Sequence, residues 1–169
     1  MLDLVEAYKN HSRQIFTFIF LRVNKNREIA EDILQETFLK AFKYKDKYNP
    51  ELANEKTWLI AIAKNLVTDY YKGRYKYVGE KLEDFVDYKD ESVSLEESVD
   101  EKLEYESVVK ALDLLSDKDR ELIILRYINE LELEEISKIL EMSYDNVKVS
   151  VHRAVVKLRE ILKINYKSQ

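Results

Sequence analysis

The sequence contains no cysteine, a single proline and two glycines among its 169 residues. The lack of cysteine excludes disulfides, thiol catalysis and cysteine-ligated zinc. The scarcity of glycine and proline favours long helices over sandwiches and barrels, which need many turns. No apolar run approaches the roughly 20 residues that span a bilayer, and the N-terminus lacks the layout of a signal peptide. We therefore expect a soluble, cytoplasmic protein without direct membrane insertion.

Histidine is also scarce, since His11 and His152 are the only two in the chain. Their expected helical contexts offer neither a cysteine nor a clear nucleophile partner, and no glycine-rich loop is present to cradle phosphates. His11 is most simply a polar helix residue. We therefore expect no catalytic residues, no metal, no cofactor and no enzyme activity.

The formal net charge of −5 would be unusual for a nucleic-acid binder if it were spread evenly. Residues 1–80 instead carry 14 Lys and Arg against 11 Asp and Glu, whereas residues 81–107 carry 3 against 11. Residues 108–169 carry 11 of each sign. The acidity is concentrated in one central stretch, so the overall charge does not exclude DNA contact.

Apolar residues recur at helical spacing through an N-terminal domain, residues 1–77. Three helical segments follow from the pattern, and Asn10 is a candidate point for a break in the first. Their apolar positions are Leu4, Tyr8, Ile15, Phe18 and Ile19, then Ile29, Ile33, Leu34, Thr37, Phe38, Ala41 and Phe42, then Trp58, Leu59, Ile62, Ala63, Leu66 and Val67.

The pattern fails over residues 78–100, where like charges and scattered apolar residues predict an acidic, flexible linker. It resumes in a C-terminal domain, residues 101–169, in which Ser116 and Asp119 have the spacing of a capping box. A helix over 133–140, a turn and a long helix from Tyr144 to about Ile164 predict a helix-turn-helix. The predicted fold is therefore all-α, with two small helical domains.

The last helix has an apolar face for packing and a second face suited to a major groove. Arginine can bond guanine in bidentate fashion, and valine can meet a thymine methyl. The alternative is a solvated surface on a packing helix. The candidate DNA-binding residues on this face are Asn146, Lys148, Val149, His152 and Arg153.

A second candidate for nucleic-acid contact follows Trp58, where positive charges alternate with aromatic rings. Cations can follow phosphates while rings stack on unpaired bases, which suits single-stranded DNA. A basic helix end with its tyrosines in the core explains the stretch about as well. Its candidate residues are Trp58, Lys64, Asn65, Tyr70, Tyr71, Lys72 and Arg74.

Three segments, in order, resemble motifs of the sigma-70 family, in its extracytoplasmic-function group. Residues 30–42 (AEDILQETFLKAF) resemble the helix that docks on RNA polymerase, and residues 57–70 (TWLIAIAKNLVTDY) resemble the helix that melts promoters and reads the minus-ten element. Residues 147–160 resemble the helix that reads the minus-thirty-five element. The chain is identified as a member of this family because all three motifs occur in the family's order.

The resemblance implies a sigma factor that binds core RNA polymerase and directs it to promoter DNA, both duplex and melted. The polymerase-binding residues would be Asp32, Gln35, Glu36 and Leu39. The basic and aromatic stretch after Trp58 would bind the melted minus-ten strand, with Asn65 beside the pocket for a flipped base. The face around Arg153 would read the minus-thirty-five duplex, and an anti-sigma factor is an expected partner.

Several features depart from the family pattern, and one is Glu55, which stands where an aromatic residue is common. Glu141 occupies a turn where glycine is common, which costs energy if that residue adopts a positive φ. Val149 and Val156 make the proposed minus-thirty-five reader more apolar than usual. The rival interpretations are a free-standing helix-turn-helix repressor, which would normally dimerise, and a polymerase-binding module that does not initiate transcription.

Overall fold

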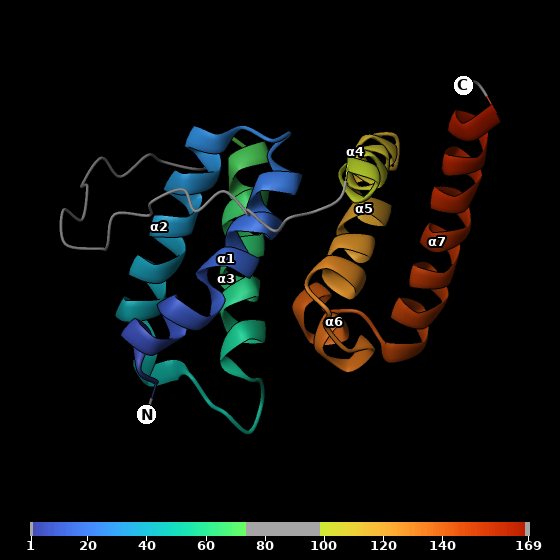
Figure 1. The fold of residues 1–169 in the computed structure, drawn as a ribbon. Coiled ribbons are helices and arrows are strands. Elements are labelled where there is room, and N and C mark those ends of the chain that lie inside the picture. The colour runs from blue at the N-terminus through green and yellow to red at the C-terminus, as the bar shows by residue number, and fades with distance from the viewer. Residues whose placement is uncertain (1, 74–98, 168–169) are drawn as a thin grey trace.

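The computed structural model describes residues 2–73 and 99–167, and within these ranges the chain forms helices and turns but no strand. The N-terminal domain contains α1 (Leu4–Arg22), α2 (Arg27–Lys43), the short 3-10 turn η1 (Lys45–Lys47) and α3 (Glu55–Tyr71). The C-terminal domain contains α4 (Val99–Asp113), α5 (Asp117–Ile123), the π-helical turn η2 (Ile124–Ile128), α6 (Leu133–Leu140) and α7 (Tyr144–Lys167). The all-α prediction is confirmed (Figure 1). Arg74 and most of the predicted linker lie outside the described residues.

Side-chain caps define where the N-terminal helices begin. Asp3 accepts hydrogen bonds from two backbone N–H groups of α1, and Asn26 and Asn54 each accept one at the starts of α2 and α3. Each such cap stabilises its helix by about 1 kcal/mol. α1 runs unbroken through Asn10, whose amide donates to Glu6 one turn earlier at 3.4 Å. The predicted break at Asn10 is therefore wrong.

The three N-terminal helices pack against one another around fully buried side chains. Phe18 and Ile19 of α1 meet this core together with Ile33 of α2 and Leu59 and Ile60 of α3. These positions recur three or four residues apart along their helices, so each helix turns one apolar face inward. The outer side of α2 remains accessible at Gln35, whereas part of the outer side of α3 contacts α6.

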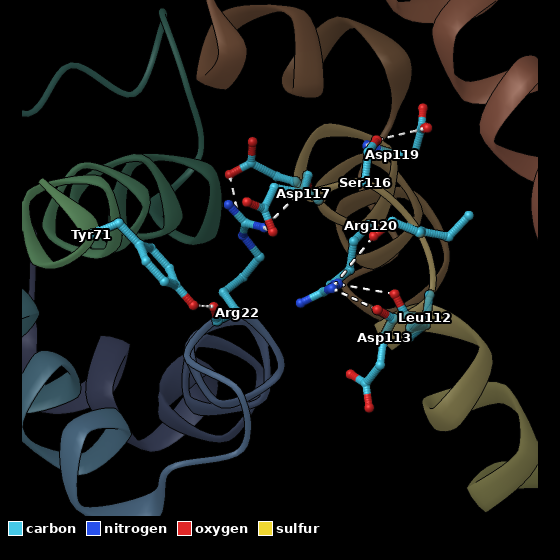
Figure 2. Close-up of polar contacts among 10 residues, drawn as sticks. Arg22, Tyr71, Leu112, Asp113, Ser116, Asp117, Asp119 and Arg120 are labelled. Atoms are coloured by element: carbon cyan, nitrogen blue, oxygen red, sulfur yellow. Dashed lines mark hydrogen bonds and ion pairs between the residues drawn. The ribbon is translucent and has the colours of Figure 1, made fainter.

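In the C-terminal domain, the end of α4 and the start of α5 are joined by polar contacts (Figure 2). The Ser116 hydroxyl accepts from the Asp119 N–H at 3.2 Å, which confirms the predicted cap. The Asp119 carboxylate accepts from the Ser116 hydroxyl at 2.8 Å, so the second half of the capping box is not a backbone contact. Arg120, which is 8% exposed, donates to the carbonyls of Leu112 at 2.9 Å and Asp113 at 3.1 Å. It thereby satisfies carbonyls that the end of a helix leaves unpaired.

The helix-turn-helix forms as the sequence predicts, with α6 at the predicted bounds and α7 extending to Lys167. Glu141 ends α6 in the left-handed conformation, with a φ of 54°. The Ser143 hydroxyl accepts from the Asn146 N–H at 3.3 Å and so caps α7. α7 then packs on α4, α5 and α6 through one face.

The two domains are in contact. α3 lies against α6, and α1 lies against η2. In Figure 1, α2 lies on one side of the molecule and α7 on the opposite side, with α4, α5 and α6 between α7 and the N-terminal helices.

Candidate nucleic-acid interface

The reading face of α7 is separated from its packing face. Val147, Val151 and Ala154 are buried against the rest of the C-terminal domain. The five predicted DNA-binding residues all lie on the exposed side, and they are Asn146, Lys148, Val149, His152 and Arg153. This arrangement can place an arginine and a lysine against DNA without disturbing the core. The exposure is as predicted, while contact with DNA stays a prediction.

Apolar side chains interrupt this polar face. Val149 is 48% exposed and Val156 is 40% exposed. Scattered exposed apolar residues are normal on protein surfaces, but here they alternate with Lys148, His152 and Arg153. Valine methyl groups among cationic donors can contact a thymine methyl beside a phosphate or a guanine edge.

The predicted minus-ten residues do not share a single face of α3. Residues seven positions apart lie nearly in line, because seven residues make about two helical turns. Trp58, Asn65 and Lys72 therefore form one stripe. Lys64 and Tyr71 belong to a second stripe, which begins at Thr57. The second stripe faces the C-terminal domain, since Thr57 donates to Glu135 of α6 at 2.7 Å.

The aromatic residues of α3 are partly engaged in packing. Trp58 is half-buried, and its ring lies 5.3 Å from that of Tyr48. The ring of Tyr70 meets that of Tyr71 edge to face at 5.2 Å, and the Tyr71 hydroxyl donates to the carbonyl of Arg22 in α1. Burial raises the pKa of Tyr71 above its usual value, although Arg22 nearby lowers it. Tyr71 is therefore held in place, yet 48% of it remains exposed.

An open pocket lies where α1 meets the loop before α3. Its lining residues are Asn10, His11, Gln14, Tyr48, Pro50, Asn54, Glu55 and Lys56. The His11 imidazole lies 3.7 Å from the Glu55 carboxylate. Burial lowers the pKa of His11 despite the opposing effect of Glu55. Asn65 lies more than two turns farther along α3 and is not part of this lining, so the structure does not bring it to this pocket.

A cluster of lysines and aromatic rings at the end of α2 escaped the sequence analysis. The ammonium of Lys45 lies 4.8 Å from the centre of the Phe42 ring, and that of Lys47 lies 4.9 Å from the centre of the Tyr44 ring. Phe42 is 62% exposed. Aromatic residues and lysines alternate over residues 42–45 of the sequence, which could have indicated this cluster. The helical spacing of Phe42 also fits the apolar stripe of its helix, so the spacing alone predicts a packed residue.

The predicted polymerase-docking residues lie together on the outer side of α2. Gln35 is exposed, and Asp32, Glu36 and Leu39 are partly exposed. Burial, together with the charges of Glu28 and Glu31, raises the pKa of Asp32. The face is therefore acidic around one leucine, as predicted, and it suits a basic protein surface.

Neither a metal centre nor a membrane span emerges from the described ranges. Among residues 2–73 and 99–167, no group of three or more His, Cys, Asp and Glu could hold a metal ion. Within the same ranges, no helix has both the length and the apolar character needed to cross a membrane. The candidate functional features of the described residues are therefore the exposed faces of α2, α3 and α7.

Comparison with protein families gives two matches in the order of the sequence. Residues 7–77 match the model of sigma-70 region 2, and residues 105–158 match that of sigma-70 region 4. The first match includes most of α1 and all of α2 and α3, and the second runs from within α4 into α7.

Individual proteins match over nearly the full chain. The ECF RNA polymerase sigma factor SigW of Bacillus subtilis is 34% identical, and the match covers 95% of this chain and 88% of SigW. The sigma factor SigM of the same organism is 29% identical, with 95% of each chain covered. Both relatives are named as ECF RNA polymerase sigma factors.

Two solved structures have the same fold. The sigma factor RpoE of Bartonella quintana, solved with the anti-sigma factor NepR, superposes with a TM-score of 0.70 at 25% identity, covering 94% of this chain and 96% of RpoE. CnrH, solved with the cytosolic domain of CnrY, superposes with a TM-score of 0.69 at 21% identity, covering 95% of this chain and 88% of CnrH. The chain therefore belongs to the sigma-70 family, in its extracytoplasmic-function group, and acts as an RNA polymerase sigma factor in transcription initiation.

Proposed function

We propose that this sigma factor directs core RNA polymerase to promoters by reading the minus-thirty-five duplex with α7 and the melted minus-ten strand with α3. The observation that carries the proposal is the exposed face of α7, where Lys148, His152 and Arg153 stand clear of the core. A helix-turn-helix with such a face is built to enter a major groove. The family membership supplies the polymerase as the protein that holds both helices on one promoter.

The mechanism is binding without covalent chemistry, so the chain is not an enzyme. Extruding a base from the duplex costs a few kcal/mol, and stacking on aromatic rings offsets that cost. On α3, Trp58 and Tyr71 supply rings, while Lys64 and Lys72 supply positive charge. The exposed lysine and aromatic cluster at Phe42 and Tyr44 extends this surface beyond the residues that the sequence analysis assigned.

Neither reading helix needs high affinity alone. Once the polymerase fixes both domains, the second DNA contact becomes effectively intramolecular and gains from a high local concentration. This explains how a chain of net charge −5 can act on DNA. In the same proposal, the acidic face of α2 around Asp32 and Glu36 binds a basic surface of the polymerase.

Partners and location follow from the same proposal. The protein acts in the cytoplasm, where it meets polymerase and promoter DNA. An anti-sigma factor holds it inactive, as the complex of the sigma factor RpoE with the anti-sigma factor NepR supports. An autonomous helix-turn-helix repressor is a weaker alternative, because the family matches span both domains.

Co-purification with core RNA polymerase tests the first part of the proposal. The wild-type chain is expected to bind in stoichiometric amounts, and a variant combining Asp32→Lys, Gln35→Ala and Glu36→Lys is expected to lose binding while remaining folded. A control with two reversed charges elsewhere in the domain, Glu6→Lys with Glu51→Lys, should bind as wild type does. Failure of well-folded wild type to bind, with any anti-sigma factor removed, would contradict the proposal and favour the autonomous DNA binder.

A further inference from the structure

The surface between the two domains is basic on one side and acidic on the other. At the end of α1, Arg22 donates from Nη1 to the carbonyl of Asp117 at 3.1 Å, and its guanidinium lies 3.7 Å from the Glu121 carboxylate and 3.9 Å from that of Asp117. Figure 2 shows Arg22 directed toward Asp117 from the N-terminal domain. Lys25, which follows α1, pairs with Asp113 of α4. Two cations of one domain are thus matched by three carboxylates of the other.

The same polarity is found at the opposite end of this surface. At the start of α3, the amide of Asn54 donates to a carboxylate oxygen of Glu135 at 2.6 Å, and the Thr57 hydroxyl donates to the same oxygen at 2.7 Å. Lys56 donates to the carbonyl of Asn129 at 3.1 Å. Burial would raise the pKa of Glu135, but these hydrogen bonds and one from the Glu132 N–H, with Lys56 nearby, hold it below its usual value. The carboxylate is therefore bound as an anion.

The middle of the surface joins these two ends. Lys64 of α3 is close enough to Glu121 for its positive charge to oppose the rise in the Glu121 pKa that burial causes. Asn129, which is fully buried after the turn η2, donates from its amide to the carbonyl of Gln14 in α1 at 2.9 Å. Contacts between the domains therefore extend from the start of α5, past η2, to the start of α6.

The acidic residues of the C-terminal domain take up donors that a nucleic-acid strand would also use. Phosphates are bound by lysine and arginine, by hydroxyl and amide side chains, and by the positive ends of helices. Glu135 accepts from an amide and a hydroxyl at the beginning of α3, since Asn54 and Thr57 both donate to it, and the positive charge of Lys56 is nearby. The donors that bind the Glu135 carboxylate are thus of the same kinds as those that bind phosphates.

We propose that Arg22, Lys25, Lys56 and Lys64 form a surface that binds the phosphates of the melted promoter strand, and that the acidic side of the C-terminal domain is a competing intramolecular ligand for it. We call the observed packing the closed arrangement. This inference rests on the proposed function, and it extends the strand-binding surface from α3 to the end of α1. Strand binding then requires the domains to separate.

The closed arrangement covers only part of the proposed binding machinery. Figure 1 shows α2 on the side of the N-terminal domain away from the C-terminal domain, and α7 on the side of the C-terminal domain away from the N-terminal helices. Asp32 and Gln35 remain at the surface, as do His152 and Arg153. The free protein can therefore present its polymerase-docking and duplex-reading faces while its single-strand surface stays covered.

Crosslinking tests the closed arrangement without DNA. Lys138 donates to the carbonyl of Leu52 across the domain boundary at 2.7 Å, and both residues are exposed. Because the chain has no cysteine, Leu52→Cys with Lys138→Cys introduces the only two thiols, which a short bismaleimide can join. High-yield intramolecular crosslinking is expected in the free protein. A yield no higher than in a control pair on surfaces turned away from each other, Glu36→Cys with Arg159→Cys, would overturn the inference and leave the proposed function standing.

The crosslinked protein then tests the competition. The probes are a fluorescent pool of random single-stranded DNA and the same pool as duplex. Crosslinking is expected to lower single-strand affinity at least tenfold and to leave duplex affinity within about twofold, because only an open domain pair exposes the strand surface. Unchanged single-strand affinity after crosslinking would overturn the competition. Absence of single-strand binding by every form, with core polymerase present, would instead contradict the proposed function.

Single substitutions give an independent measurement. Glu135→Ala removes the anion from Asn54 and Thr57, and we expect single-strand affinity to rise about tenfold and the crosslinking yield to fall. Glu134→Ala removes an equal charge from an exposed neighbour and should change neither. Because Glu135 also caps α6 through the Glu132 N–H, Asp113→Ala is the second variant, which removes the carboxylate paired with Lys25 and leaves that cap intact. If both variants bind single strands no better than wild type, the competition does not exist.

Discussion

The two helices proposed to bind DNA, α3 and α7, differ in whether their outer side also contacts the other domain. α7 buries one face through Val147, Val151 and Ala154 and leaves the other for its ligand. α3 is buried on its core face as well, but one of its outer stripes also contacts the C-terminal domain, because Thr57 donates to Glu135. A change on the outer face of α7 should therefore affect DNA alone, whereas a change on α3 affects both DNA and the packing of the domains.

The largest effect is expected where a side chain serves only DNA. Arg153→Ala should lower affinity for a minus-thirty-five duplex about tenfold to a hundredfold, because a bidentate contact to guanine contributes about 1–3 kcal/mol. Binding by the holoenzyme to a selected promoter duplex measures this loss. Arg159→Ala, an exposed arginine one and a half turns farther along α7, should lose less than about threefold. Equal losses in both variants would show that α7 acts by general charge and not by reading bases.

A substitution in the turn before α7 should change the stability of the fold and not the DNA sequence that α7 recognises. Glu141 has a φ of 54°, and a glycine is free of the steric cost of that conformation. Glu141→Gly is expected to raise the free energy of unfolding by about 1 kcal/mol. Urea unfolding followed by circular dichroism measures the change. Glu141→Ala removes the same charge while keeping a Cβ, so a gain of equal size in both variants would mean that charge, not backbone conformation, is responsible.

Lys64 of α3 and Lys72, which directly follows α3, test whether a residue near the C-terminal domain affects both strand binding and domain packing. Lys72 is exposed outside the closed surface, whereas Lys64 faces Glu121. Lys72→Ala should weaken single-strand binding about threefold and reduce the salt dependence by about 0.7 in slope, as expected for one lost phosphate contact. Lys64→Ala loses a similar contact but also loosens the closed arrangement, so its net loss should be smaller.

The Glu135→Ala background separates these two contributions. Once the C-terminal domain no longer competes, Lys64→Ala should weaken single-strand binding as much as Lys72→Ala does. Titration of the same labelled strand over a range of salt concentrations measures both lysine variants in each background, against wild type and Glu135→Ala. A difference between the two lysine variants that persists in this background would mean that Lys64 acts through something other than the closed arrangement.

The same comparison shows what sequence could predict. The helix-turn-helix, the Ser116 cap and the exposed face of α7 all follow from local rules, since each depends on residues within a few turns of one another. Of the predicted minus-ten residues, those from Trp58 to Tyr71 lie on α3, Lys72 directly follows it, and Arg74 lies outside the described residues. Their separation into two stripes follows from their spacing of seven residues, so this part was available from the sequence.

The contacts between the domains could not be predicted in the same way. Asn129 and Gln14 are 115 residues apart, and Glu135 and Thr57 are 78 residues apart. No periodic pattern relates such positions. Which residues of the C-terminal domain face α1 and α3 also depends on the turn η2. There the N–H of Asn129 donates to the carbonyl of Ile124, five residues earlier, at 2.9 Å. That single wider turn changes which side chains face α1 and α3.

The smallest expected effect concerns the contact that ties α7 to α5. The Asp119 carboxylate lies 2.6 Å from the Lys157 ammonium. Burial would raise the pKa of Asp119, but the hydrogen bonds from Lys157 and Ser116 hold it below its usual value of 3.8. A carboxyl with a depressed folded pKa stabilises the fold above its unfolded pKa and loses that contribution as pH falls through the folded value.

Asp119→Asn should therefore lower the free energy of unfolding by about 0.5 kcal/mol at pH 7, since Lys157 is more than half exposed. The difference from wild type should remain constant down to about pH 4 and then disappear as the pH falls further. Urea unfolding across this pH series measures the difference, and Lys157→Gln should reproduce most of it because it removes the other half of the pair. Equal stability of all three proteins at pH 7 would mean that α7 is held by its apolar face alone, and the contrast with α3 would then be sharper: polar contacts would fix the position of the domains but not that of α7.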